Sequence, residues 1–395
     1  CFFTGFTSGL PLFILISLLP AWLSDSGLEL KSIGLFALIQ FPFTWKFIWA
    51  PFFDRFSFSM GRRRGWLIIF QVLLLISIAV AGFLSPTSQI TIVALISIII
   101  AFFSASQDVV IDAYRRELLL DHELGLGNAI HVNAYKIASL IPGSLSLILA
   151  DIFAWDLVFL ITALFMLPGI ALTLLIKEPQ LKTLPPRTVK EAVVEPFKEF
   201  KNRKGLKEAL LILLFIFLYK IGDSMATALA TPFYLELGFS MTEIGVIAKN
   251  AGLWPGIAGG LLGGVWMIKL GINRALWIFG ILQMFATLSF AWLASVGDNN
   301  LILAITVGLE FFAAGLGTTA FIAYIAKTTN PKYTATQFAL FTSLASVPRT
   351  LTNASTGYLV EFFGWYDFFI VCFLLAIPGM LLLFKIAPWN QSNAS

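Results

Sequence analysis

Long, nearly uninterrupted apolar runs are the feature that most constrains the fold of this chain. Two of them, residues 66–84 and 88–103, follow each other with only a short break. An α-helix rises ~1.5 Å per residue, so about 20 apolar residues cross the ~30 Å hydrocarbon layer of a bilayer. No run shows the alternation of apolar and polar residues that is typical of a membrane β-barrel. The chain is therefore predicted to be an all-α membrane protein.

The composition agrees with this prediction. Only 12% of the 395 residues are charged, whereas soluble domains carry about 25%. The formal charge of +4 comes from basic residues that lie between the apolar runs, which argues against a nucleic-acid partner. The two cysteines, Cys1 and Cys372, do not suggest a disulfide framework. Because an apolar segment begins at Cys1, we expect that the natural N-terminus lies further upstream.

Twelve transmembrane helices are predicted, in two six-helix halves. The first half, residues 1–176, has spans near 2–24, 32–53, 66–84, 88–112, 125–150 and 155–176. Residues 177–207 form a polar linker with nine Lys and Arg residues. The second half, residues 208–395, has spans near 208–235, 242–268, 275–296, 300–326, 333–360 and 365–386. Positive charge is concentrated in the even-numbered loops, the linker and the C-terminal tail, so both termini are predicted to be cytoplasmic.

Two related basic loops follow the second and eighth spans. The first reads D-R-F at 54–56 and G-R-R-R at 61–64, and the second reads K-L-G at 269–271 and N-R at 273–274. Both resemble the loop signature of the major facilitator superfamily, once in each half. An aspartate in this loop can face the positive N-terminal end of a neighbouring helix, while the arginines hold a cytoplasmic gate. The gating residues predicted in this way are Asp54, Arg55, Arg62 and Arg63, joined by Asp112.

Further motifs resemble those of the AmpG-type muropeptide permeases, a branch of this superfamily. They are S-A-S-Q-D at 104–108, Y-K-I-G-D at 219–223 and A-T-Q-F-A-L at 335–340, and the similarity runs through nearly the whole chain. The resemblance implies a monomeric, proton-driven importer in the bacterial inner membrane. Its substrate would be N-acetylglucosaminyl-1,6-anhydro-N-acetylmuramic acid with or without its peptide. The implied roles are peptidoglycan recycling and, in some bacteria, signalling that induces β-lactamase.

Other functions remain open at this stage. The chain has no G-x-x-x-x-G-K-[ST], H-E-x-x-H or G-x-S-x-G motif and no Cys/His cluster, so neither an enzyme, a cofactor nor a bound metal is expected. A channel is less consistent with two similar halves, which favour alternating access around a central site. A permease of the same fold for siderophores or another organic anion is the remaining alternative.

Charged residues within the predicted spans mark the candidate transport site. A charge near the bilayer centre costs about 2.5–3.5 kcal/mol even on the most lenient scale, so it normally faces a cavity or an opposite charge. Asp108 is the first candidate for proton coupling, followed by Glu310 and Asp223, although Glu310 is expected to pair with a lysine. Lys220 and Asp223 lie three residues apart and can form an intrahelical pair. The predicted substrate-binding residues are Lys46, Gln107, Tyr135, Lys136, Lys220, Lys249 and Arg349.

The predicted topology can be tested with single cysteines at Ser57, Asn202 and Asn299. The first two positions should react with a membrane-impermeant thiol reagent only after the inner leaflet is breached, because they lie in loops predicted to be cytoplasmic. Asn299 should react in intact spheroplasts. Reaction of the Asn202 cysteine in intact spheroplasts would overturn the orientation.

Overall fold

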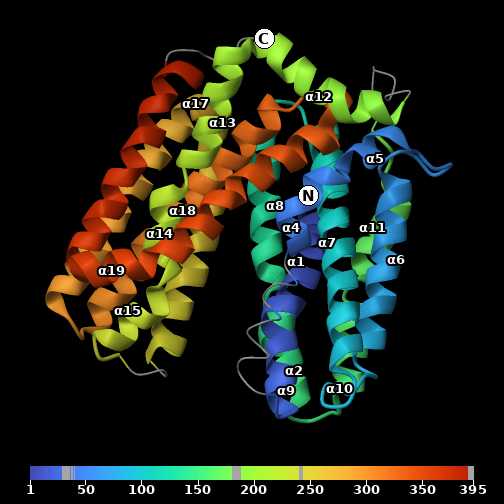
Figure 1. The fold of residues 1–395 in the computed structure, drawn as a ribbon, viewed down its shortest axis with the longest axis horizontal. Helices are drawn as coiled ribbons and strands as arrows, with labels where there is room; N and C mark the ends of the chain where they lie inside the picture. The colour runs from blue at the N-terminus through green and yellow to red at the C-terminus, as the bar shows by residue number, and fades with distance from the viewer. Residues whose placement is uncertain (29–35, 37–38, 40, 180–187, 240–242, 390–395) are drawn as a thin grey trace. The chain divides into compact units, whose positions relative to one another are not determined.

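Helices make up nearly all of the described chain (Figure 1). The computed structural model describes every residue except 29–35, 37–38, 40, 180–187, 240–242 and 390–395. The described residues form two compact units. Unit 1 comprises Cys1–Leu120, Ile130–Phe197 and Thr329–Ser343, and unit 2 comprises Asp121–Ala129, Lys198–Thr328 and Leu344–Ser395.

Unit 1 holds the helices of the first predicted half. They are α1 (Phe2–Phe13), η1 (Ile14–Leu18), α2 (Leu19–Asp25), α4 (Phe41–Trp45), η3 (Lys46–Ile48), α5 (Ala50–Arg55), α6 (Arg64–Ala81), α7 (Ile90–Leu118), most of α8 (Leu124–Ala138), η4 (Ile141–Leu145), α9 (Ser146–Ala150), α10 (Trp155–Leu164) and α11 (Leu167–Leu175). The side chains of Leu10, Leu74 and Val93 are among those that form its core. Figure 1 shows α6 and α7 side by side.

Helix α1 approaches α8 closely because two glycines face that helix. A Cβ atom added at Gly5 would collide with the carbonyl of His131, and one at Gly9 would collide with the carbonyl of Tyr135. Small residues four apart allow two membrane helices to bring their backbones together. The polar groups of α1 that follow Gly5 are therefore held at a fixed place inside unit 1.

Unit 2 holds most of the helices of the second predicted half. They are α13 (Leu206–Leu218), α14 (Ile221–Ala228), α15 (Ala230–Glu236), η5 (Ile244–Ala248), α17 (Lys249–Val296), α18 (Asn300–Thr328) and most of α19 (Thr334–Ile386). Helices α17 and α19 each contain one glycine with a left-handed backbone, Gly271 (φ 74°, ψ 163°) and Gly364 (φ 73°, ψ 165°). This region of backbone space is open almost only to glycine. Each glycine therefore turns the chain sharply between two of the predicted spans.

Short helices connect or cap these elements. The linker contains α12 (Val189–Lys204), and the one-turn helix η6 (Pro331–Tyr333) precedes α19. The first ten residues of α19 belong to unit 1, where Ala335 and Ala339 are buried beside Phe53 and Phe70. The segment after α18 is thus part of the packing of unit 1.

The membrane prediction is confirmed for most spans. Within the described residues, nine helices are long and apolar enough to cross a bilayer. One of them, Val246–Val296, contains the predicted eighth and ninth spans on either side of Gly271. The predicted spans 32–53 and 333–360 lie partly on residues, or on side chains, outside the described part of the chain.

Several predicted spans are broken rather than continuous, the second and the seventh among them. Between residues 41 and 55 the chain forms three short helices, α4, η3 and α5, and Pro51 lies in the first turn of the third. Similarly, α13, α14 and α15 replace one helix over 206–236. Trp45 (φ −104°, ψ 8°) and Lys220 (φ −106°, ψ 7°) occupy nearly the same bridging conformation at these breaks. In membrane proteins such breaks are found where the backbone lines a polar cavity or is covered by protein.

Candidate functional site

An ion pair between Lys46 and Asp108 forms the centre of the candidate site in unit 1. The ammonium of Lys46 lies 2.5 Å from the carboxylate of Asp108, and the hydroxyl of Ser8 donates to the other oxygen of that carboxylate at 2.5 Å. The lysine side chain is 7% exposed and the aspartate 19%. Three elements thus meet at one carboxylate: α1 through Ser8, η3 through Lys46 and α7 through Asp108.

The break at η3 explains how Lys46 reaches α7. The backbone turns at Trp45, and the indole of Trp49, just after η3, donates a hydrogen bond to the hydroxyl of Ser106 at 3.0 Å. This contact holds the broken segment against α7, two residues before Asp108. A continuous helix would place Lys46 differently, so the bridging conformation at Trp45 is part of the site.

A second ion pair lies one helical turn along α7. Arg115 donates to Asp112 at 2.7 Å, and both side chains are nearly buried. The guanidinium of Arg115 also lies 5.8 Å from the ring centroid of Phe338, which is within the range of a cation–π contact. Asp112 was predicted as a gating residue, and this role stays a prediction. In unit 1, each of these two acids therefore has its own basic partner.

Neighbouring polar groups surround the first ion pair. The amide of Gln107 is buried and donates to the backbone carbonyl of Thr7 at 2.8 Å, which ties α7 to α1. The Oε1 atom of Gln107 and the Nδ1 atom of His131 are buried and have no hydrogen-bond partner among the described residues. Buried polar atoms of this kind are rare in folded proteins. They are suitable positions for a bound water or for polar groups of a substrate.

Two predicted substrate-binding residues, Tyr135 and Lys136, lie on the part of α8 that belongs to unit 1. Tyr135 is half-buried, with its ring 5.5 Å from that of Phe13 in an edge-on arrangement. Lys136 follows it and is also half-buried. The structure thus places both residues on the helix that Gly5 and Gly9 of α1 contact, and their role in substrate binding stays a prediction.

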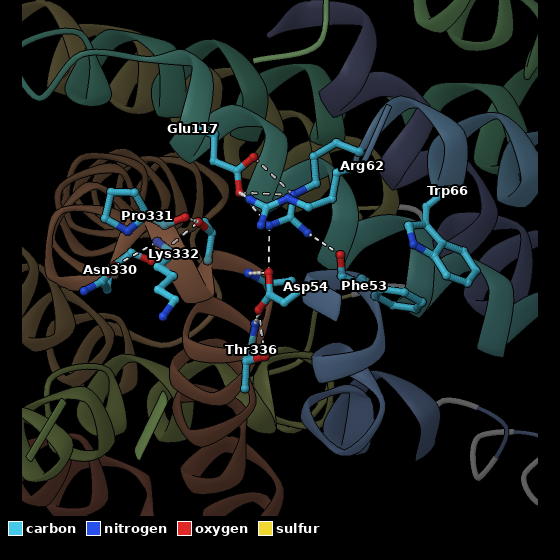
Figure 2. A network of polar contacts seen from close by, with 12 residues as sticks. Phe53, Asp54, Arg62, Trp66, Glu117, Asn330, Pro331, Lys332 and Thr336 are labelled. Carbon is cyan, nitrogen blue, oxygen red and sulfur yellow. Dashed lines mark hydrogen bonds and ion pairs between the residues drawn. The ribbon is translucent and has the colours of Figure 1, made fainter. Parts of the chain in front are cut away.

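A separate polar network includes Asp54 of α5, Glu117 of α7 and Thr336 of α19 (Figure 2), and Arg63 joins the first two. Arg63 is completely buried and uses every nitrogen of its guanidinium. It donates to Asp54 at 2.7 Å, to Glu117 at 2.5 Å and to the carbonyl of Phe53 at 2.8 Å. Burial opposes the charge of Arg63, but the carboxylates of Glu117 and Asp54 outweigh it and hold the pKa of this arginine above its ordinary value.

Asp54 also caps the N-terminus of α19. Its carboxylate accepts hydrogen bonds from the backbone N–H groups of Ala335 at 3.2 Å and Thr336 at 2.9 Å, and from the hydroxyl of Thr336 at 2.8 Å (Figure 2). The first N–H groups of a helix have no partner within the helix and carry partial positive charge. The prediction that Asp54 faces the N-terminal end of a helix is therefore confirmed, and the helix is α19.

The other arginines of this loop have different surroundings. Arg62 donates to Glu117 at 2.8 Å, and burial, followed by repulsion from Arg63, lowers the pKa of Arg62. Arg55 is half-buried and lies against the ring of Phe56, 5.3 Å from its centroid. Only Arg62 and Arg63 of the predicted gating arginines thus join the network.

A third polar cluster lies in unit 2. Lys220, at the break between α13 and α14, pairs with Asp223 at 2.9 Å, as the spacing of three residues predicted. The expected pairing of Glu310 with a lysine is wrong for the described side chains: Glu310 is fully buried, and neither of its carboxyl oxygens has a hydrogen-bond partner there. The reason is that Lys220 turns toward Asp223 on its own helix. The side chains of Lys249 and Arg349 lie outside the described residues.

Several residues of these clusters were not predicted from the sequence. Glu117 and Glu178 are the main ones: Glu117 binds Arg62 and Arg63, and Glu178 accepts from the backbone N–H groups of Arg63 and Arg64 at 2.7 and 3.1 Å. Glu117 follows two arginines at the end of α7, so an acid near a basic loop was the available signal. Ser8 carried no signal beyond its place in the first span.

Comparison with known proteins identifies the family. The family model of the major facilitator superfamily matches residues 1–353. The chain is a member of the major facilitator superfamily. It is 50% identical over its whole length to a protein of Haemophilus influenzae, 95% of which is covered, and 41% identical over 96% of its length to the anhydromuropeptide permease of Escherichia coli K12, 77% of which is covered.

Solved structures agree with this family. The fucose:proton symporter of Escherichia coli superposes on this AmpG-type protein with a TM-score of 0.73 over 99% of this chain and 97% of that one, at 14% identity. At this identity the likeness concerns the fold alone. The resemblance stated from the motifs at 104–108, 219–223 and 335–340 is thus confirmed, and the protein is a membrane transporter.

The Asp54 network should behave as one cooperative unit. Removing one partner of a buried ion pair costs about 3–5 kcal/mol, because the other charge is left uncompensated. Asp54→Asn and Arg63→Gln should each lower the thermal unfolding midpoint of the detergent-solubilised transporter, and the double variant should lose less than the sum. Asp298→Asn, at an exposed position, is the matched control. Additive losses would show that the two residues act independently.

Proposed function

We propose that this AmpG-type transporter is a proton-coupled importer of anhydromuropeptides in the bacterial inner membrane, working by alternating access in peptidoglycan recycling. The observation that carries the choice of substrate is the 41% identity to a protein named as an anhydromuropeptide permease, over 96% of this chain. The Lys46–Asp108 and Lys220–Asp223 pairs support a carrier, because intramembrane charges in transporters mark substrate and proton pathways. The substrate is a sugar whose attached peptide carries carboxylates, which suits the cations at the site.

The Lys46–Asp108 pair supports a simple coupling mechanism. While Asp108 is ionised, its carboxylate holds the ammonium of Lys46 and the hydroxyl of Ser8. When Asp108 takes up a proton, the attraction between the two side chains is lost, and Lys46 is left as a positive charge in a nearly buried place. A carboxylate of the substrate then becomes the favoured partner of Lys46. Loss of the proton restores the pair and displaces the substrate.

Surrounding groups would orient the neutral part of the substrate. The Oε1 atom of Gln107 and the Nδ1 atom of His131 are buried and have no hydrogen-bond partner among the described residues. We assign these two atoms to the binding of hydroxyl or amide groups of the sugar. Tyr135, four residues after His131 on α8, offers an aromatic ring on which a sugar could stack. In this proposal Lys136 and the second-half cations Lys220, Lys249 and Arg349 supply further positive charge for the peptide carboxylates.

The Asp54 network is the proposed gate on the side predicted to be cytoplasmic. Three hydrogen bonds join the Asp54 carboxylate to the first turn of α19, and Arg63 holds that carboxylate in place. Opening this side requires α19 to leave Asp54, which would expose an arginine with two carboxylates. Water can then solvate the separated groups, so the cost of opening is lower than that of breaking the network while it stays buried.

Substrate and coupling can be tested together in proteoliposomes. The purified transporter should accumulate anhydromuropeptide when an inward proton gradient is imposed, and a protonophore should abolish accumulation. A ferric siderophore should not be taken up. Uptake of the siderophore in place of the muropeptide would favour the organic-anion alternative, and accumulation without a proton gradient would refute symport.

Asp108 should carry the coupling proton at this ion pair. Asp108→Asn keeps the size of the side chain and mimics its protonated form, so accumulation driven by the pH gradient should be lost while substrate binding survives in part. Asp112→Asn should slow transport or lower expression, and its pH profile should match that of the wild type, because Asp112 pairs with Arg115 rather than with Lys46. An Asp108→Asn variant that still concentrates substrate with unchanged pH dependence would rule out this role.

A further inference from the structure

The polar cluster of unit 2 contains one more acid than base. Lys220 and Asp223 form an ion pair at 2.9 Å, with each side chain 15% exposed. Glu310 of α18 lies beside Asp223 and is fully buried. Among the described side chains, Lys220 is the one cation near these two carboxyl groups. Unit 1 differs in this respect, since Asp108 has Lys46 and Asp112 has Arg115.

The contact between the two carboxyl groups carries information about their protonation. Two carboxylates can form a hydrogen bond with each other only if one of them holds a proton, because the ionised group is an acceptor only. Both oxygens of Glu310 lack a donor among the described residues. Fully ionised, the pair would place two negative charges in a low-dielectric site against one positive charge. Such a pair of carboxyls normally retains one proton.

The other described groups near the two carboxyls supply no second positive charge. Tyr234 on α15, Cys372 on α19 and Thr287 on α17 lie near Glu310, and Tyr219 and Gln283 lie near Asp223. The hydroxyl of Thr287 already donates to the carbonyl of Gln283, at 3.3 Å. In the described part of the cluster, a proton is therefore the missing donor.

A small cavity borders Asp223. It is lined by Tyr219, Asp223, Gln283, Met284, Thr287 and Met380, together with Gly280 and Ala376, and it has room for about one water molecule. The side-chain amide nitrogen of Gln283 is buried and has no hydrogen-bond partner among the described residues. A water held between this amide and the Asp223 carboxyl would give a proton a path to the carboxyl pair. The site is thus built from a buried acid, a polar amide and a space between them.

We propose that Asp223 and Glu310 share one proton and form a second proton-binding site, separate from Asp108. The step adds a proton from water to the carboxyl pair, which changes the Lys220–Asp223–Glu310 cluster from one net negative charge to neutral. The proton then forms the hydrogen bond that Glu310 otherwise lacks. This proposal rests on the proposed proton-coupled function, and it gives the transporter one titrating carboxyl in each unit.

The test measures the proton directly. Infrared difference spectra of the purified transporter in lipid, recorded across a pH titration without substrate, distinguish a protonated carboxyl from a carboxylate by its carbonyl stretching band. The wild type should have such a band at neutral pH. Glu310→Gln and Asp223→Asn should each abolish it, because one acid then remains against one base. Asp108→Asn is the control that should keep the band.

Each other outcome contradicts the proposal. A wild type without the band, a band that survives in Glu310→Gln or in Asp223→Asn, or a band lost in Asp108→Asn would assign the proton elsewhere. Two isosteric variants keep the test informative if one of them fails to fold. The measurement needs no substrate, so a failure to transport anhydromuropeptide would refute the proposed function and leave the infrared result standing.

Discussion

The cost of an unpaired charge in a low-dielectric interior governs the arrangement of this transporter. The two acids inside the predicted fourth span, Asp108 and Asp112, have basic partners at 2.5 and 2.7 Å. Arg63, although buried completely, is held by two carboxylates and a carbonyl. A buried ion pair is weak evidence for stability, because replacing both partners with apolar residues is often neutral. Removing one partner, in contrast, costs about 3–5 kcal/mol, because the other charge is left uncompensated. In the proposed mechanism each cluster therefore has two states, closed as a pair or opened toward another partner.

Helix breaks place the lysines of two of these pairs. Lys46 follows Trp45 and Lys220 directly precedes α14, and the backbone at Trp45 and at Lys220 has nearly the same bridging conformation. An unbroken helix would satisfy its own backbone and present side chains only at fixed angles. A break frees backbone groups and lets a lysine turn toward an acid, Asp108 in unit 1 and Asp223 in unit 2. The same device thus appears once in each half of the sequence.

The sequence was sufficient for the contacts that depend on local spacing. The Lys220–Asp223 pair followed from a separation of three residues, and the apolar runs predicted the membrane helices. The partner of Asp108 did not follow, because Lys46 lies 62 residues away and reaches it only through the packing of a broken helix. The loop motif predicted that Asp54 faces a helix end, but only the fold identifies α19. The sequence predicts a lysine partner for Glu310, but Lys220, the described lysine near it, pairs with Asp223.

The geometry around Arg63 limits how this region of the protein can evolve. Its guanidinium contacts Asp54, Glu117 and the carbonyl of Phe53 in three directions, and the compact ammonium of a lysine cannot reproduce that planar fork. A single substitution at any of these charged positions leaves buried charges without compensation. Paired substitutions that remove opposite charges together are therefore expected to be tolerated better at these positions than single ones.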